Sequence, residues 1–406
     1  NFIFTIIMNQ QNKLKVFETF AGIGAQTKAL KNINVEHEVV ATSEWDINAI
    51  ISYAYIHHKD EMQKFNNPTV EEAINYLKQY TFSSDGKKPL AKLTHLKQEK
   101  LFELYKAVIT NKNFGSILQI KAKDLPNFDL LTYSYPCQAI SLQGKQEGLK
   151  KGTGTSSSLL WEIERILLEL KEENRLPKYL LMENVANLFS QKFMPYFKEW
   201  VSFLEDLGYQ TKYEVLKSSN FEIPQNRERA FAVSILKEKQ MNIDFCHSVD
   251  EFVFTQKELT HKKIKDITDD IVDKSLFLNH LEEKLKEKDG SKLKVKNTGI
   301  KSTVLLNYTT FQSENIVYFD DGIAPTITAN GAQSRIKIID SKNNNHLRYL
   351  TGAEHLKLMG FTQNDYDNLK SCSYKIAEQM IKKQAGNSIV VNVLESIFNN
   401  LFKKSN

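Results

Sequence analysis

Cysteine is scarce in this sequence, with Cys137, Cys246 and Cys372 the only three in 406 residues. An odd number without a C-x-x-C pair argues against a disulfide framework and against a thiolate zinc site. We therefore predict no metal centre and a reducing, intracellular setting. Because an unpaired cysteine is usually a small buried apolar residue without a chemical task, each of the three needs further support before it is given one.

Long apolar runs are also absent. The N-terminal stretch NFIFTII has seven residues, which is too short to span a bilayer, and it lacks the basic region and cleavage site of a signal peptide. The net charge of +5 is compatible with nucleic acid binding, but many soluble enzymes share it. We predict a soluble cytoplasmic protein with no membrane contact.

Strand and helix patterns alternate through residues 13–237. An apolar run at 14–20 leads into the turn AGIG, a helical pattern follows, and a second strand pattern ends at Glu44 and Trp45. Further strand patterns are FDLLTYSYP, PKYLLMENV, YEVLKSS and RAFAVSIL. This alternation predicts a doubly wound α/β sheet.

Two stretches depart from that pattern. Residues 60–113 are polar and mostly helical in pattern, and we read them as an insertion. From 238 to 345 the chain is first highly charged and then rich in β-formers, which predicts a smaller, mixed domain with several strands. The charged part alone is typical of a solvated helical face. Residues 346–402 look helical again and are predicted to return to the first domain.

Several chemically active side chains fall at predicted strand ends. Glu44 follows Gly24 by twenty residues, the spacing at which an acidic side chain meets the ribose of a cofactor bound over a glycine turn. Cys137 and Glu183 each come at the end of another predicted strand. Taken singly, each could be core filling or a solvated strand end. Because ligands of open parallel sheets bind at the carboxyl ends of the strands, we expect a cofactor and a thiol to face one cleft.

Read together, these stretches resemble the DNA (cytosine-5) methyltransferases. The resemblance rests on FETFAGIGAQTKAL, EW at 44–45, SYPCQAISLQGKQEGL, ENV at 183–185, QNRER at 225–229, RYLTGAEHLKLMGF and QAGNSIVVNVL. It implies a Rossmann-like S-adenosylmethionine-dependent sheet with a smaller target-recognition domain. The recognition segment and the insertion look most like the small CpG-specific enzymes of wall-less bacteria, of the mycoplasma and spiroplasma type.

The resemblance implies a catalytic set whose chemistry is clear. Carbon 5 of cytosine is a poor nucleophile, and addition of a thiolate from Cys137 to carbon 6 would activate it. A protonated Glu183 would bond to ring nitrogen 3, and its apolar strand should raise its pKa. Arg227 and Arg229 would supply a positive field that favours the thiolate.

The resemblance also implies the binding residues. S-adenosylmethionine would be bound by Phe20, Ala21, Gly22, Gly24, Glu44, Trp45, Pro136, Leu159, Asn387 and Ser388. Double-stranded DNA, with the target cytosine swung out of the stack, would be contacted by Ser141, Gln143, Gln225, Thr326, Thr328, Asn330 and Arg335. Ser334 is a further candidate near the DNA. We expect a monomer without an obligate protein partner.

The sequence departs from the family pattern at three places. Ala25 replaces a third glycine, Ser116 replaces an acidic residue that bonds the adenine amino group, and Ser156–Ser158 lack an arginine common before the next helix. None of these removes a catalytic residue. Alternatives are the same chemistry at another short cytosine-containing site, a transfer RNA methyltransferase, and a catalytically silent DNA-binding protein. The long recognition segment disfavours transfer RNA, and the intact catalytic set disfavours a silent protein.

Overall fold

The computed structural model describes residues 13–135, 159–237, 239, 245–255, 259–288, 290, 293 and 295–403. The predictions for Pro136, Cys137, Ser141, Gln143 and Ser156–Ser158 lie outside the described residues and stay predictions.

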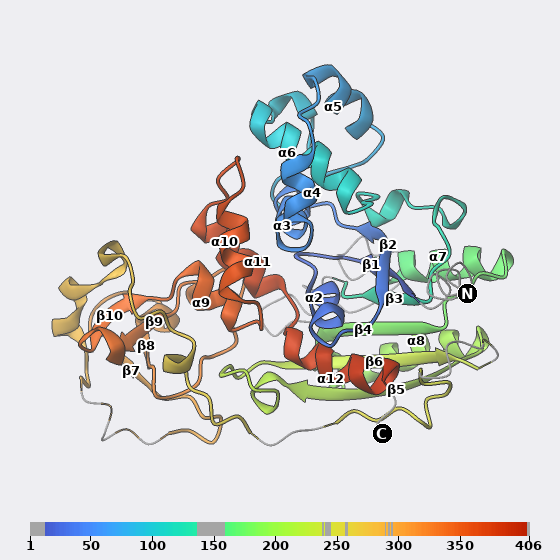
Figure 1. Ribbon diagram of the computed structural model, residues 1–406. Helices are drawn as coiled ribbons and strands as arrows, with labels where there is room; N and C mark the ends of the chain where they lie inside the picture. Colours follow the sequence, from blue (N-terminus) through green and yellow to red (C-terminus); the bar gives the residue numbers. More distant parts are fainter. Residues whose placement is uncertain are drawn as a thin grey trace, which may run out of the picture.

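A six-stranded sheet forms the centre of the first domain (Figure 1). Its strands, in the order β2-β1-β3-β4-β6-β5, are β2 (His37–Ser43), β1 (Leu14–Thr19), β3 (Leu130–Tyr133), β4 (Tyr179–Val185), β6 (Glu228–Leu236) and β5 (Tyr209–Lys217). β2, β1, β3 and β4 are parallel, which confirms the predicted α/β fold. β6 runs antiparallel to both its neighbours, because residues 218–227 join β5 to β6 without the crossover that parallel pairing needs.

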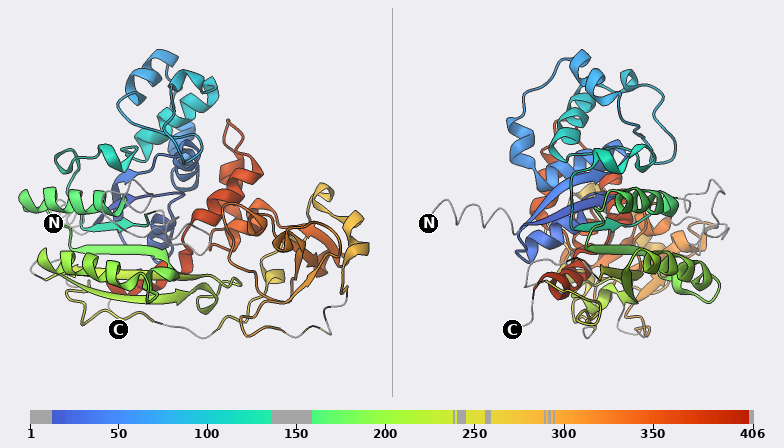
Figure 2. Two further views of the ribbon diagram at one scale, coloured as in Figure 1. Left: turned by 180° about the vertical axis from the view of Figure 1, so that it is seen from behind. Right: turned by 90° about the vertical axis from the view of Figure 1, so that its right-hand side faces the viewer.

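Helices cover both faces of this sheet. α2 (Ala25–Asn32), α3 (Ile47–His57) and α12 (Val391–Phe402) lie on one face, and α7 (Leu160–Glu172) and α8 (Met194–Asp206) on the other (Figures 1 and 2). Along β1 the side chains alternate, with Val16 in the first core and Phe17 in the second. The inner strands β1, β3 and β4 are therefore buried on both sides, as their apolar sequences predict, whereas the edge strand β5 is partly exposed.

The predicted insertion contains α4 (Lys59–Lys64), α5 (Val70–Leu77) and α6 (Gln98–Thr110), which stand beyond the β2 edge (Figure 1). The loop after α5 returns to the sheet: the Ser83 amide donates to the Trp45 carbonyl at 2.7 Å, and the Ile47 amide donates to the Ser83 carbonyl at 3.0 Å. The insertion is thus fastened directly behind the turn that carries Glu44.

A second, four-stranded sheet confirms the predicted strand-containing smaller domain. Its order is β10 (His346–Tyr349), β9 (Lys337–Asp340), β8 (Ile316–Phe319) and β7 (Ser302–Val304). β8 and β9 are parallel and the other pairs are antiparallel. β10 starts at the predicted domain boundary and pairs within this sheet. The described part of the charged stretch between 259 and 288 forms only short 3-10 turns, not a long helix.

α9 (Gly352–Lys357), α10 (Gln363–Lys370) and α11 (Glu378–Asn387) lie between the two sheets (Figure 2). The sequence suggests helix from residue 348, but the chain stays extended through Tyr349 and turns helical at Gly352. Thr351 sets that start, because its hydroxyl accepts from the Glu354 amide while Glu354 bonds back to the Thr351 amide. Within the described residues, no helix combines the length and the apolar character that crossing a membrane requires.

Candidate active site

The carboxyl ends of the parallel strands bring the predicted residues to one edge of the sheet. Thr19 pairs with both Ser43 and Tyr133, and Tyr133 pairs with Met182. Phe20 and Glu44 directly follow the ends of β1 and β2, and Glu183 follows Met182 on β4. Positions far apart in sequence therefore meet at one edge, where the sequence predicts a single cleft.

Glu183 and Arg229 form the central ion pair of this edge. Arg229 Nε lies 3.2 Å from Glu183 Oε1, and the two side chains keep 19% and 11% of their exposure. Burial raises the pKa of Glu183 above its ordinary value, although Arg229 and Arg227 both lower it. A carboxyl in this setting can stay protonated and donate a hydrogen bond, the role predicted for it.

Asn184 links β4 to the segment that follows β3 and precedes Cys137. Its Nδ2 donates to the Tyr135 carbonyl at 3.2 Å, and its Oδ1 accepts from the Val185 amide at 2.8 Å. Tyr135 is the last described residue before Pro136 and Cys137. Sequence reasoning did not assign Asn184 a role, although it lies inside the ENV motif.

Gln225 and Arg227 are buried and bond main-chain groups. Gln225 Nε2 donates to the Leu358 carbonyl at 2.8 Å, and its Oε1 accepts from the Ile327 amide at 3.0 Å. Arg227 donates to the carbonyls of Ile327, Gly386 and Ser388 at 2.9, 3.2 and 2.8 Å. Of the QNRER residues, only Arg229 is paired directly with Glu183.

The glycine turn has an unusual backbone. Phe20, Gly22 and Gly24 all have positive φ, at 54°, 55° and 77°. A non-glycine residue at positive φ is strained and persists where the surrounding structure fixes it, as at ligand sites. A Cβ at Gly24 would lie 2.4 Å from His57 Nε2, whereas among the described residues one at Gly22 would meet only the Phe20 carbonyl, at 4.0 Å. Gly24 is thus needed for packing, and Gly22 leaves open room beside the turn.

The Glu44 carboxyl, at the end of the neighbouring strand β2, hydrogen-bonds the glycine turn. Its Oε2 accepts from the Gly22 amide at 3.0 Å, and its Oε1 accepts from the amides of Trp45 and Asp46 at 2.8 Å each. Burial, together with the Asp46 carboxylate, raises the pKa of Glu44 to about 7 against these bonds. Trp45 is half-buried beside it. The structure thus places the predicted ribose-binding carboxyl directly at the glycine turn.

The remaining predicted cofactor residues differ in exposure. Ala21 is buried, and Leu159 directly precedes α7. Asn387 ends α11 and is exposed, whereas Ser388 is buried. Ser116, the position of a family departure, starts a 3-10 turn, where its hydroxyl accepts from the Leu118 amide at 3.4 Å.

The predicted DNA-facing residues of the smaller domain lie on the segment between β8 and β9. Thr326 Oγ1 donates to the Asn226 carbonyl at 2.6 Å, and Thr328 Oγ1 donates to the Asn330 carbonyl at 2.7 Å. Asn330 is exposed. Arg335 is also exposed and lies 2.6 Å from Glu314 Oε1. This segment connects the second sheet with the QNRER link.

Sequence reasoning missed a buried carboxyl, Glu18, two residues before Phe20. Thr27 Oγ1 donates to Glu18 Oε1 at 2.7 Å and lies 2.7 Å from the Tyr53 hydroxyl, while Glu18 Oε2 is buried and has no hydrogen-bond partner in the described part of the chain. Burial raises the pKa of Glu18 to about 7. An acidic residue inside the apolar run LKVFETF was the available signal.

The other two cysteines are buried, as is usual for cysteines without a chemical task. Cys246 and Cys372 are buried and form no disulfide with one another or with any other described residue, and burial raises the pKa of each to about 11. Neither can supply much thiolate near neutral pH. No group of side chains suited to a metal ion occurs in the part of the chain that the structure describes.

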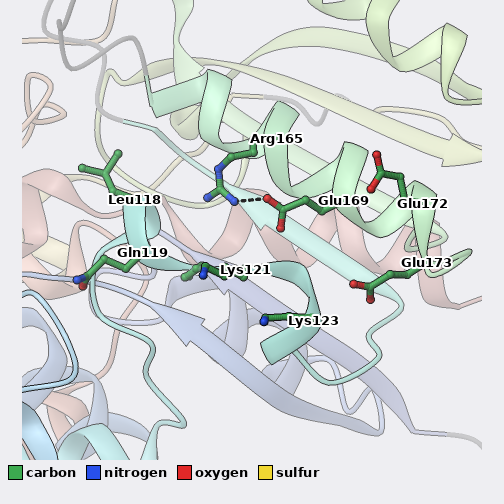
Figure 3. Close-up of a pocket in the computed structure, with 9 residues that line it drawn as sticks. Leu118, Gln119, Lys121, Lys123, Arg165, Glu169, Glu172 and Glu173 are labelled. Atoms are coloured by element: carbon green, nitrogen blue, oxygen red, sulfur yellow. Dashed lines mark hydrogen bonds and ion pairs between the residues drawn. The ribbon is translucent and has the colours of Figure 1, made fainter.

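A surface hollow of about 730 Å³ lies elsewhere, between α7 and the turns after Ser116 (Figure 3). Charges of both signs surround it, and Arg165 pairs there with Glu169 at 2.6 Å. Its walls are Leu118, Gln119, Ile120, Lys121, Lys123, Arg165, Glu169, Glu172 and Glu173. None of the predicted site residues that the structure describes lines it.

Comparison with known proteins places these features in a family. Residues 91–403 match the model described as C-5 cytosine-specific DNA methylase. The chain is 38% identical over 97% of its length to the orphan methyltransferase M.SssI of Spiroplasma monobiae, covering 99% of that protein. It is 35% identical over 96% of its length to the type II methyltransferase M2.ScrFI of Lactococcus lactis, again covering 99%.

Solved structures support the fold. The Dnmt2 methyltransferase of S. pombe matches with a TM-score of 0.57 at 19% identity, covering 95% of this chain and 97% of that one. The methyltransferase EhMeth of Entamoeba histolytica matches with a TM-score of 0.56 at 17% identity, covering 97% and 98%. At these identities the likeness concerns the fold alone.

Proposed function

The chain belongs to the C-5 cytosine-specific DNA methylase family and is a cytosine-5 DNA methyltransferase, and from this premise we propose its substrate and mechanism. It transfers a methyl group from S-adenosylmethionine to carbon 5 of a cytosine swung out of duplex DNA. It works as a monomer through a covalent bond between Cys137 Sγ and carbon 6. The observation that carries the proposal is the buried Glu183 paired with Arg229 at the strand edge.

The chemical step follows from these side chains. The Cys137 thiolate forms a bond to carbon 6, and the electron pair displaced from the ring double bond moves toward nitrogen 3. Glu183, whose pKa is raised by burial, donates a proton there, which is worth about 10² to 10⁴ in rate. Carbon 5 then takes the methyl group, and the donor would leave as the neutral thioether. Water accepts the carbon 5 proton, and the electron pair left behind re-forms the ring double bond as the Cys137 thiolate leaves carbon 6. Nitrogen 3 returns its proton to Glu183. Arg229 holds the Glu183 carboxyl in place.

S-adenosylmethionine, when bound, supplies the methyl group. The strand edge fits it, because Gly22 leaves open room beside the turn and the Glu44 carboxyl borders that turn. Phe20 and Trp45 offer aromatic faces for the adenine, Glu44 an acceptor for the ribose hydroxyls, and Asn387 and Ser388 a closing turn. Ala21, Gly24, Pro136 and Leu159 complete the proposed set.

Duplex DNA is the proposed substrate, with CpG as the target. Because a base inside the helix cannot reach Cys137, it must leave the stack at a cost of a few kcal/mol. Ser141 and Gln143 follow the nucleophile and would fill the gap. Thr326, Thr328, Asn330 and Arg335 lie on the segment between β8 and β9, where the chain would approach the DNA. Gln225 is buried behind this segment and bonds the Ile327 amide. The choice of CpG rests on the sequence resemblance described above.

Bisulfite sequencing of plasmid DNA treated with the pure protein and the methyl donor tests the proposal. Conversion-resistant cytosines confined to CpG support it, and resistance at another short site would overturn the choice of CpG. Tritium transferred from the donor to transfer RNA but not to DNA would replace the substrate. Binding of DNA without tritium transfer to either would identify a silent DNA-binding protein.

A further inference from the structure

Main-chain hydrogen bonds join the link between β5 and β6 (residues 218–227) to the stretch between β8 and β9 (residues 320–336), which is called the recognition segment from here on. The Ala324 amide donates to the Pro224 carbonyl and the Asn226 amide to the Ala324 carbonyl, each at 2.8 Å. Gln225 and Ala324 form a parallel bridge. Two stretches about a hundred residues apart in sequence therefore lie side by side where both carry predicted DNA-facing residues.

Two side chains from the link hydrogen-bond the main-chain amide and carbonyl of Ile327, which is fully buried. Gln225 Oε1 accepts from its amide at 3.0 Å, and Arg227 Nη1 donates to its carbonyl at 2.9 Å. Ile327 stands between Thr326 and Thr328. The position of these two threonines is thus set by Gln225 and Arg227.

Arg227 holds the cofactor-closing turn in the same way. Its Nη2 donates to the carbonyls of Gly386 and Ser388, on either side of Asn387. Gly386 packs backbone to backbone on the recognition segment, since a Cβ there would lie 2.3 Å from the Thr328 carbonyl carbon and 2.4 Å from the Ala329 nitrogen. We call Gln225, Arg227, Ile327, Gly386 and Ser388 the buried node.

We propose that Gln225 and Arg227 are positioning residues, which hold the recognition segment and the cofactor-closing turn at a fixed spacing from Glu183. The inference rests on the proposed function. The terminal nitrogens of Arg227 already donate hydrogen bonds to three carbonyls. Its role is therefore to position the DNA and the methyl donor. Arg229, two residues on, is the arginine that faces the carboxyl.

Three variants of the full-length protein test this role: Gln225→Ala, Arg227→Lys and Gly386→Ala. Gly386→Ala leaves every polar group of the node intact and only forces the two backbones apart. Arg175→Lys is the matched control, because Arg175 also donates to main-chain carbonyls, those of Ala122 and Leu125, away from the node. Thermal melting followed by circular dichroism confirms that each variant is folded.

Gln225→Ala and Gly386→Ala should raise KM for a duplex CpG oligonucleotide at least tenfold. Arg227→Lys and Gly386→Ala should weaken S-adenosylmethionine binding at least fivefold in calorimetry without DNA. Single-turnover rates at saturating DNA and donor should stay within threefold of wild type, and Arg175→Lys should change none of these constants.

A hundredfold loss of the saturating rate in Arg227→Lys with unchanged KM and donor affinity would overturn the proposal, since it would place Arg227 in the chemical step. Unchanged constants in Gly386→Ala and Gln225→Ala would overturn it as well. If the wild-type protein bound donor and DNA but transferred no methyl group, the proposed function would fail. The donor and DNA affinities of the variants would still test the node in that case.

Discussion

At the residue scale, the protonation of Glu183 should control the rate. Because burial raises its pKa, the neutral form persists to higher pH than in a free carboxyl, and the rate should fall as pH rises through that pKa. Glu183→Gln cannot donate the proton and should lower turnover at least tenfold. The fall in rate at alkaline pH that Glu183 causes should be absent from this variant. Single-turnover rates from pH 5 to 9 measure both effects. An unchanged rate in the variant would remove Glu183 from the mechanism.

Cys137 is the residue whose role can be separated most cleanly from binding. The thiol acts only after the base has left the stack, so Cys137→Ser should abolish methylation while leaving DNA affinity near that of wild type. Duplex DNA carrying 5-fluorocytosine should become covalently attached to wild-type protein at residue 137, since fluorine blocks release of the adduct. Peptide mapping of the trapped complex is the measurement. Turnover retained in the serine variant would exclude sulfur attack.

Glu18 should make stability depend on pH. Its pKa is raised to about 7 in the folded chain from an ordinary 4.5, so between these values the folded state holds a proton that the unfolded state has lost. Stability from this group is therefore greatest below pH 4.5 and falls as pH rises to 7, by about 3 kcal/mol in all. Glu18→Gln is neutral throughout.

Urea unfolding at pH 5 and pH 8 measures this difference. The wild-type free energy of unfolding should drop between the two values by about 2.5 kcal/mol more than that of Glu18→Gln, because the unfolded carboxyl is already mostly ionised at pH 5. Glu44, whose pKa is also raised to about 7, adds the same trend to both proteins and cancels in the comparison. Equal pH dependence in the two proteins would show that Glu18 does not titrate in this range.

At the scale of elements, a buried arginine fastens the second sheet to α9. Arg348 on β10 is fully buried, with Nε 2.5 Å from Asp340 on β9 and its terminal nitrogens 2.9 and 2.8 Å from the Glu354 carboxylate. Arg348→Leu leaves two buried carboxylates without a counter-ion and should cost about 3 to 5 kcal/mol in urea unfolding. Lys370→Met, which removes an exposed pair with Glu378, should cost less than about 1 kcal/mol. Equal losses would contradict the assignment.

The sequence predicted best those elements whose cause is local. Apolar runs and strand-end carboxyls identify β1 to β4, Glu44 and Glu183, because periodicity and strand ends are visible in a short window. The antiparallel β6 was not predicted, since its direction depends on the missing crossover. Gln225 and Arg227 carry a recognisable motif, but their partners lie at 327, 358 and 386–388. No local pattern reveals such contacts.

At the scale of the molecule, the ends of the chain form one core. α12 packs on α2, Phe402 lies 5.1 Å from the rings of both Tyr179 and Phe245, and the Cys246 amide donates to the Leu401 carbonyl at 2.8 Å. The seven buried residues of α12 are all apolar. At about 1.5 to 3 kcal/mol each, their burial matches or exceeds the net stability of about 5 to 15 kcal/mol typical of a folded protein.

The first domain should therefore not fold without the last sixty or so residues, even though they are remote in sequence. A fragment ending at residue 345 loses α12 and the turn that Arg227 holds, and it should show no cooperative thermal transition. Co-expression with a second fragment covering 346–406 should restore the transition and donor binding, because the contacts are non-covalent. Circular dichroism melts and calorimetry with S-adenosylmethionine distinguish these states. A cooperative melt of the first fragment alone would show that α12 only covers a core that is already complete.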